Sequence, residues 1–422
     1  MLMILLGLYL VAFTFLSVKY FRLAVQLFII TLPSYLIRFS IGPLPSTLLE
    51  LEFGVIVLVW LVRYAKNDLP VIQTFFKQNR VFAAALGVFF ITSVAGIFVS
   101  DMWFYSLGQW RAYFLEPLVF FIILIGRRKE ISAKHLVFAL ILSTISINCL
   151  GIIQKITGAW YPPSLWDDEL FGRVTSFFTS PNAVALYLAP LVALAGIFWA
   201  DQNNSRKKII LLATGLSIVT LILTKSLGAW LALFAGGLIF LFFIGYKKST
   251  LMALVFALVV GSLPPISSLL LAKEKSGSNR LTLWSYSWNY LSASPKNFVF
   301  GAGIRQFFRK VQKPFYTPQE IERLIYPHNV FLNFWTEIGL FGMIGFIIIF
   351  ILLFNKAKEF YQTNRLPGAS LLAALVIFLV HGLVDVPYFK NDLAFLFWIL
   401  AAIIWSLSLR TTKLPIIEHE QK

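Results

Sequence analysis

One histidine in the sequence has surroundings that suit acid–base chemistry. His328 stands in Tyr326-Pro327-His328-Asn329, where a long polar segment meets an apolar one. Proline fits the first turn of a helix, so we expect His328 at the start of a membrane helix, where an imidazole suits proton abstraction near neutral pH. Glu337 follows nine residues later, about 13 Å along an ideal helix, too far to orient His328 without a bend. From these residues alone, a histidine that only caps the helix at the membrane interface is the simpler interpretation.

Two arginines have contexts that suit anion binding. Arg173 precedes the turn Ser180-Pro181-Asn182, where Ser180 is expected to cap a helix. An arginine beside a helix N-terminus favours phosphate. Arg280 begins a predicted amphipathic helix over residues 280–292, which we expect at headgroup depth. Alternatively, either guanidinium reaches for lipid headgroups or for nearby acidic residues.

Other ionisable residues lie in or beside apolar segments, where burial in lipid is costly. Lys225 ends one segment, and His381 and Asp385 lie four residues apart on one face of another. This pair either joins two helices by a hydrogen bond or assists an outer site, and the sequence leaves both open.

Cofactor motifs are missing from the sequence. There is no phosphate-binding loop, no dinucleotide fingerprint and no Cys/His metal spacing. The consecutive acids Asp167-Asp168-Glu169 point in different directions, so a solvated turn is expected there and no metal site. We therefore expect no cofactor and no nucleic acid partner, and any donor substrate should arrive on a lipid carrier.

The composition indicates which elements position these residues. Of 422 residues, 59% are hydrophobic and 13% charged, against about 25% charged in soluble proteins. We expect an all-α fold: one integral membrane domain over 1–422, a polytopic bundle of 12–13 transmembrane helices. The expected spans are 2–17, 20–39, 47–64, 81–99, 106–125, 134–154, 181–199, 208–224, 227–245, 249–271, 328–354, 369–387 and 391–409. The first two form one re-entrant element if the count is twelve.

Charge in the loops predicts the orientation. Alternate short loops hold most Lys and Arg residues, as in Arg127-Arg128-Lys129 and Arg206-Lys207-Lys208, which places them in the cytoplasm. Residues 155–180 and 272–327 then face outward. The loop 272–327 carries nine basic and three acidic residues, which suits either anionic headgroups or an anionic substrate such as a diphosphate.

Several motifs occur in an order that resembles the O-antigen ligase / O-antigen polymerase superfamily. They are Asn279-Arg280-Leu281-Thr282-Leu283-Trp284, Gly301-Ala302-Gly303, Pro327-His328-Asn329 and Glu337-Ile338-Gly339-Leu340-Phe341-Gly342. The resemblance runs over residues 140–400 and is most specific across 276–345. It implies a GT-C-like fold with one long extracytoplasmic loop, 272–327, that contains short helices.

The resemblance also implies an activity and roles for residues. Its members transfer a glycan from an undecaprenyl diphosphate carrier to an acceptor hydroxyl, without metal and with inversion, at the outer (periplasmic) face of the bacterial cytoplasmic (inner) membrane. His328 would be the general base, and Arg173 and Arg280 would bind the donor diphosphate. Lys225, Glu337, His381 and Asp385 would support them. Where the family often has Ser-Arg-Gly-Ala, this chain has Ser226-Leu227-Gly228-Ala229, so Lys225 replaces the arginine or one donor contact is missing.

Several alternatives remain open from the sequence. Ligases and polymerases differ in the acceptor, and a glycan, a lipid or a protein hydroxyl all remain candidates. Membrane lipids are expected partners in any case. A transporter or flippase for an anionic substrate also fits the basic composition, although no internal repeat supports it. A scaffold for envelope assembly would leave His328 dispensable.

Overall fold

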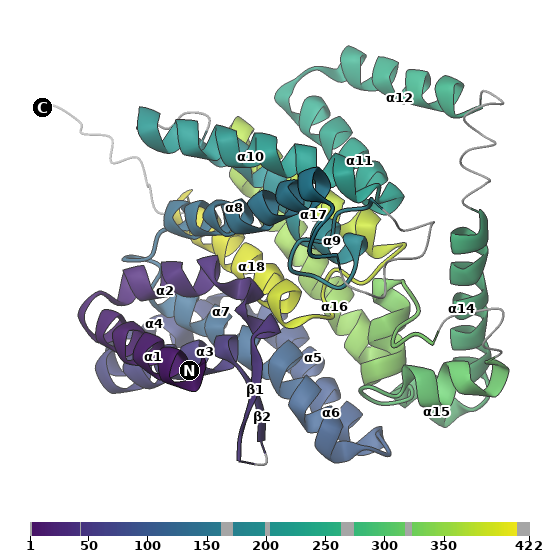
Figure 1. The fold of residues 1–422 in the computed structure, drawn as a ribbon, viewed down its shortest axis with the longest axis horizontal. Helices are drawn as coiled ribbons and strands as arrows, with labels where there is room; N and C mark the ends of the chain where they lie inside the picture. The colour runs from purple at the N-terminus through teal and green to yellow at the C-terminus, as the bar shows by residue number, and fades with distance from the viewer. Residues whose placement is uncertain are drawn as a thin grey trace, which may run out of the picture.

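The computed structural model describes residues 2–42, 44–161, 172–198, 203–262, 274–316 and 323–411. Over these residues the chain is almost wholly helical (Figure 1). The N-terminal part consists of α1 (Leu2–Lys19), α2 (Phe21–Ile30), η1 (Leu32–Leu36), β1 (Arg38–Ile41), β2 (Leu44–Thr47), α3 (Leu48–Arg63), α4 (Ala65–Gln78), α5 (Arg80–Val99), α6 (Trp103–Trp110), η2 (Arg111–Leu115), α7 (Glu116–Gly126) and α8 (Ala133–Thr157).

The second part contains the remaining helices and the outer loop. It consists of α9 (Pro181–Leu194), η4 (Ala195–Phe198), α10 (Asn204–Thr224), α11 (Leu227–Ile244), α12 (Lys247–Ser262), α14 (Glu274–Ser292), α15 (Pro295–Phe300), η5 (Phe307–Gln312), η6 (Lys313–Phe315), α16 (Val330–Thr363), α17 (Arg365–Gly382) and α18 (Asn391–Thr411). The loop segment between α12 and α16 thus holds short helices, as the sequence predicted.

Nine segments of the described chain are long and apolar enough to cross a membrane, which confirms a polytopic helical membrane protein. They are Arg80–Val99, Trp103–Gly126, Ala133–Thr157, Pro181–Phe198, Asn204–Thr224, Leu227–Ile244, Val330–Thr363, Arg365–Gly382 and Asn391–Leu409. The other expected spans, near the N-terminus and at 249–271, are not among these nine segments, and residues 263–271 lie outside the described part.

The expected span at residues 20–39 is wrong. Helix α2 ends at Ile30, and Pro33 then occupies a short 3-10 turn, because proline lacks the N–H donor that a helix interior needs. The antiparallel hairpin β1–β2 follows, with Arg38 opposite Thr47. Thr47 then caps α3 together with Glu50 in a reciprocal capping box. The turn and the hairpin therefore replace the second half of the expected helix.

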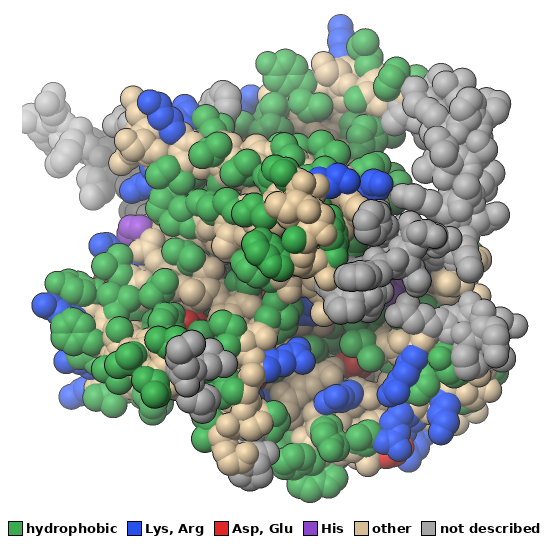
Figure 2. Space-filling model, in the orientation of Figure 1, with side chains coloured by type: hydrophobic (Ala, Val, Ile, Leu, Met, Phe, Trp, Pro, Cys, Tyr) green, Lys and Arg blue, Asp and Glu red, His purple; other side chains and the backbone are tan. Residues whose placement is uncertain are grey.

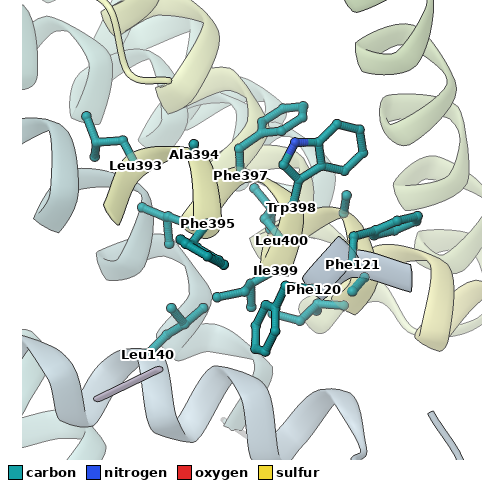
Figure 3. Packing of buried hydrophobic residues seen from close by; sticks show 14 of the residues in the cluster. Phe120, Phe121, Leu140, Leu393, Ala394, Phe395, Phe397, Trp398, Ile399 and Leu400 are labelled. Atoms are coloured by element: carbon teal, nitrogen blue, oxygen red, sulfur yellow. The ribbon is translucent and has the colours of Figure 1, made fainter. Parts of the chain in front are cut away.

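Helix α18 runs through the centre of the bundle. It packs against α7, α16 and α8, and its apolar side chains are almost all buried. Aromatic rings fill this core, as Phe120 and Trp398 do in Figure 3. Lipid tails are as apolar as these side chains, so helix association depends on close packing of this kind. The centre of the bundle is therefore a rigid support for the loop that precedes α18.

The outer loop is anchored where α16 is interrupted. Gly339 breaks the helix with φ 78° and lies against the backbone of Phe300, which ends α15. The N–H of Ala302 donates to the carbonyl of Thr336 at 2.7 Å, and the N–H of Ile304 donates to that of Gly96 at 3.0 Å. Backbone contacts this close require glycine at 301, 303 and 339, where φ is positive. The glycine motifs thus fix the loop against α5 and α16.

Replacing Gly301 by alanine is expected to destabilise the protein strongly. An added Cβ would lie 2.6 Å from the Thr336 carbonyl oxygen, at a φ of +71°; a left-handed L residue alone costs about 1–2 kcal/mol. A clearly lower thermal unfolding temperature in detergent is the expected result. Gly237→Ala is the matched control, because that position is helical and has nothing within 4 Å of the added Cβ. Equal unfolding temperatures for the two variants would contradict the anchoring role.

Candidate functional site

His328 is paired with a buried carboxylate. Its Nδ1 lies 3.2 Å from Oδ1 of Asp385, and the two side chains are 20% and 4% exposed. The same carboxylate oxygen accepts a hydrogen bond from the Val386 N–H at 2.9 Å, which fixes its position. Because a carboxylate accepts hydrogen bonds, the pair favours the tautomer with the proton on Nδ1 and leaves Nε2 free to accept one.

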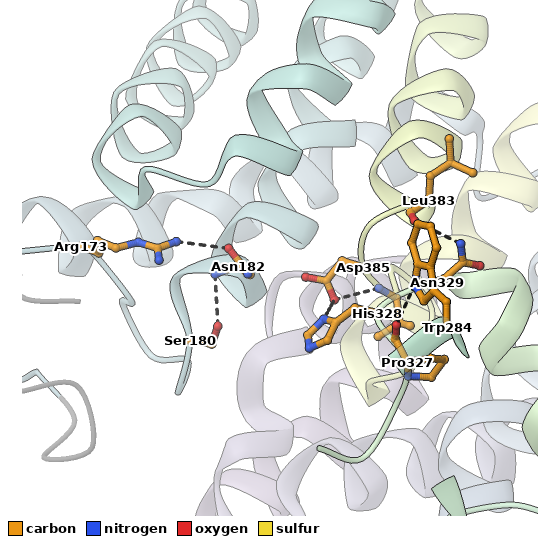
Figure 4. A network of polar contacts seen from close by, with 10 residues as sticks. Arg173, Ser180, Asn182, Trp284, Pro327, His328, Asn329, Leu383 and Asp385 are labelled. Atoms are coloured by element: carbon orange, nitrogen blue, oxygen red, sulfur yellow. Dashed lines mark hydrogen bonds and ion pairs between the residues drawn. The ribbon is translucent and has the colours of Figure 1, made fainter. Parts of the chain in front are cut away.

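The backbone around His328 is held from two sides. The Trp284 indole donates to the Pro327 carbonyl at 3.0 Å, and the Asn329 amide donates to the Leu383 carbonyl at 3.1 Å (Figure 4). Asn329 also caps α16 by accepting from the N–H groups of the next turn. Pro327 and His328 therefore precede the helix and do not form its first turn as expected. His328 has a φ of 52°, a left-handed conformation that these contacts maintain.

The pKa of the Asp385 carboxyl is low in spite of its burial. Burial alone raises the pKa of this carboxyl, but the His328 imidazole, its hydrogen bond and His381 together bring the pKa below its ordinary range. Lys390 lies in the same connection between α17 and α18; burial lowers the pKa of its ammonium, which Asp392 and Asp385 partly offset. The connection thus concentrates ionisable groups around the imidazole.

Arg173 lies at the ends of α9 and α10. Its Nε donates to the Thr224 carbonyl at 2.9 Å, and its Nη2 donates to Oδ1 of Asn182 at 3.3 Å. Ser180 caps α9, as expected. Burial lowers the pKa of the Arg173 guanidinium. In Figure 4 the guanidinium points toward the side of the site where Asp385 and His328 lie, without touching either.

The turn at Lys225 connects the surroundings of Arg173 with those of His381. Lys225 follows Thr224 in a left-handed conformation, φ 49°, and its side chain is exposed. Gly228 then approaches His381 so closely that an added Cβ would lie 3.4 Å from its Nε2. Arg280 acts electrostatically on the same histidine, which in turn acts on Asp385. Arg280 therefore acts on the His381–Asp385–His328 group, while Arg173 and Lys225 lie at the turn that leads to Leu227, the first residue of α11, and to Gly228 beside His381.

Glu337 lies in a different group from His328. The Gln109 amide donates to its Oε2 at 3.2 Å, and the Arg305 backbone and charge face it near the loop anchor. The carboxyl is 2% exposed. The bend that would bring it to His328 is absent, because the break in α16 lies beyond it at Gly339.

Exposed cationic side chains of the outer loop form a second basic region. Figure 2 shows Lys and Arg side chains gathered over the part of the molecule where Figure 1 places α15. The exposed residues of this kind in the loop include Lys296, Arg309, Lys313 and Arg323. On the described residues, Lys310 is paired with Asp101 at 2.9 Å.

Sequence reasoning missed two residues of this region. Asp392 is fully buried in the first turn of α18, and Lys390 precedes it. An acidic residue within an apolar span is itself a signal of function, and Asp392 falls in the expected span 391–409.

The described residues contain no group of three His, Cys, Asp or Glu side chains that could hold a metal ion. The acidic residues 167–169 lie outside this part of the chain. Comparison with protein families matches residues 212–347 to a model described as O-antigen ligase. That range includes Lys225, Arg280, His328 and Glu337. No match was found among curated protein sequences.

Proposed function

Since residues 212–347 identify the chain as a member of the O-antigen ligase / O-antigen polymerase superfamily, we propose that it transfers a glycan from an undecaprenyl diphosphate carrier to an acceptor hydroxyl. The family is one of glycosyltransferase-like membrane enzymes with lipid-linked glycans and acceptors as partners. The observation that carries the proposal is the His328–Asp385 pair, together with Arg280, which acts on the adjacent His381. Arg173 and Lys225 lie at the turn that leads to Gly228 beside the same histidine.

In the proposed reaction, His328 acts as general base. Nε2 accepts the proton of the acceptor hydroxyl while its oxygen attacks the anomeric carbon, and the bond from that carbon to the diphosphate oxygen breaks. Asp385 holds the imidazole in the required tautomer and stabilises the imidazolium that forms. The attacking and leaving oxygens lie on opposite faces of the anomeric carbon, so the configuration inverts. The products are the glycosylated acceptor and undecaprenyl diphosphate.

The cationic residues act on the leaving group. Negative charge on the diphosphate oxygen increases as the glycosidic bond breaks, and cations placed beforehand lower that barrier. Arg173 is preorganised by Thr224 and Asn182, so it loses little freedom when it binds the anion. Lys225 supplies a point charge where the family has an arginine, which lacks the planar two-point contact of a guanidinium.

The proposed site faces outward from the bacterial cytoplasmic membrane. The Lys- and Arg-rich short loops favour the cytoplasm, and residues 272–328 then lie outside. Polymerisation of repeat units is the alternative to ligation within the same family, with the same donor and base.

Reconstitution tests the proposal directly. The purified full chain in liposomes, supplied with carrier-linked glycan and acceptor from the source membranes, is expected to release undecaprenyl diphosphate and glycosylated acceptor in equal amounts. Because cationic side chains replace a metal in the proposed reaction, the rate should stay within twofold in excess EDTA. Analysis of products by mass spectrometry measures both. Movement of the intact donor across the bilayer without cleavage would instead support a flippase.

A further inference from the structure

Two fully buried polar side chains near the proposed base have no side-chain hydrogen-bond partner among the described residues. Both amide atoms of Asn333 are unpaired, and the Asp392 carboxylate faces only the backbone N–H groups of Asp392 and Leu393 at the start of α18. Buried polar groups in native proteins are nearly always paired, so such atoms indicate a ligand or solvent that completes them. Asn333 lies one helical turn before Glu337 on the same face of α16.

Tyrosine side chains gather around Asp392. It lies within electrostatic range of Tyr35 on η1 and of Tyr113 on η2. On the described part of the chain neither hydroxyl has a hydrogen-bond partner. Tyr113 belongs to a π-helical turn, a distortion frequent at functional sites, and its carbonyl accepts from the Tyr388 hydroxyl at 2.8 Å. We call Tyr35, Tyr113, Lys390 and Asp392 the tyrosine cluster. Asn333 adjoins it through Glu337, one helical turn away, which acts electrostatically on Tyr113.

The tyrosine cluster adjoins the proposed base. The Lys390 ammonium interacts electrostatically with two carboxylates, that of Asp392 and that of Asp385, the partner of His328. Tyr326 also lies within electrostatic range of Tyr35, and its ring stands edge-on to the His328 ring, with centroids 5.1 Å apart. The His328 imidazole therefore adjoins the tyrosine cluster through Tyr326 and also contacts Asp385, which belongs to the group that contains Arg280.

The chemistry of the cluster suits a carbohydrate. Sugar rings present C–H faces that pack on aromatic rings, and their hydroxyls donate to carboxylates and exchange hydrogen bonds with amides and phenols. A few convergent polar groups among aromatic side chains are typical of small-molecule sites. A diphosphate would not favour this cluster, because Asp392 and Glu337 are acidic and lie near its tyrosines.

The position of the cluster selects which sugar it binds. Inversion requires the acceptor oxygen to attack from the side opposite the leaving diphosphate. Arg280 acts on His381, whereas the tyrosine cluster adjoins His328 through Tyr326. With the diphosphate bound at Arg280, the acceptor approaches from the cluster.

On the basis of the proposed function, we infer that the tyrosine cluster binds the sugar residue that carries the acceptor hydroxyl. Tyr113 and Asp392 would hold its hydroxyls, and Asn333 would bind an adjacent one. The alternative is a purely structural role, in which the Asp392 carboxylate only balances the positive N-terminus of α18 and the charge of Lys390. That alternative requires no saccharide affinity.

Binding measurements on the full chain in phosphatidylglycerol nanodiscs test this inference. One probe is undecaprenyl diphosphate alone; the other is the delipidated oligosaccharide released by mild acid from the envelope of the source cells. Tyr113→Phe and Asp392→Asn are each expected to weaken oligosaccharide binding about fivefold to tenfold, the effect of one lost hydrogen bond. The affinity for undecaprenyl diphosphate should stay within twofold.

The controls separate binding from folding and from catalysis. Tyr361→Phe removes a tyrosine hydroxyl bonded to the Phe243 carbonyl, away from the site, and should change neither affinity. If Asp392→Asn fails to fold, Tyr35→Phe replaces it. Unchanged oligosaccharide affinity in the folded variants would overturn the inference, as would a loss of undecaprenyl diphosphate binding. Transfer by His328→Ala with normal oligosaccharide binding would reject the proposed function and leave the saccharide site in place.

Discussion

Replacing His328 by alanine is expected to lower glycan transfer by about 10²–10⁴-fold, the usual contribution of a general base. The variant should retain its affinity for undecaprenyl diphosphate, because in the proposed reaction the imidazole contacts the acceptor hydroxyl and not the leaving group. Initial rates of undecaprenyl diphosphate release at saturating donor measure the change. Added imidazole should restore part of the rate, which a merely structural histidine would not permit.

Two further variants test whether the expected loss of glycan transfer comes from the loss of the general base. Asp385→Asn keeps the size of the side chain but removes the charge that stabilises an imidazolium, so its loss should be smaller than that of His328→Ala and should not respond to imidazole. His135→Ala removes a histidine from the start of α8 and should leave the rate near that of the parent chain. Full transfer by His328→Ala would exclude the general-base role.

Removing the guanidinium of Arg280 is expected to weaken binding of undecaprenyl diphosphate by about 10- to 100-fold. A hydrogen bond to a charged group contributes about 1.5–3 kcal/mol, and Arg280 lies on the His381 side of the proposed base. Fluorescence titration of Arg280→Ala in nanodiscs measures the affinity. Lys296→Ala is the matched control, because it removes an exposed charge from the same loop.

Arg173 provides an independent test of the same binding site. Arg173→Lys keeps the charge but cannot contact both Thr224 and Asn182 as the guanidinium does, so we expect a smaller loss than for Arg173→Ala. If both arginines bind one diphosphate, the losses in the Arg173→Ala, Arg280→Ala double variant should not be additive. Additive losses would place the two arginines at separate sites, and an unchanged affinity would remove the diphosphate role.

Local patterns in the sequence were sufficient to predict many elements of the structure. Ser180 caps α9, and a helix covers residues 280–292, because capping and amphipathic periodicity are properties of neighbouring residues. On that helix Leu283 and Leu291 are buried, while Leu281 and Trp288 are exposed. Contacts with η5 decide which face is covered, and the periodicity of one helix carries no information about them.

The sequence predicted which residues belong to the candidate site better than it predicted the contacts between them. His328 and Asp385 were each selected, but their pairing joins residues 57 positions apart and depends on how α17 ends beside the outer loop. Lys390 and Asp392 were overlooked, because they stand in a short connection whose burial follows from the packing of α18. Such contacts depend on the tertiary arrangement of helices.

The hydrogen bond from Trp284 to Pro327 has a mechanical consequence. It joins a helix with exposed apolar side chains to the peptide unit directly before His328. We therefore expect a change in bilayer thickness or headgroup packing that tilts α14 to reach the imidazole across a single residue. The rate of the proposed reaction should then depend on the physical state of the surrounding lipid through one indole N–H.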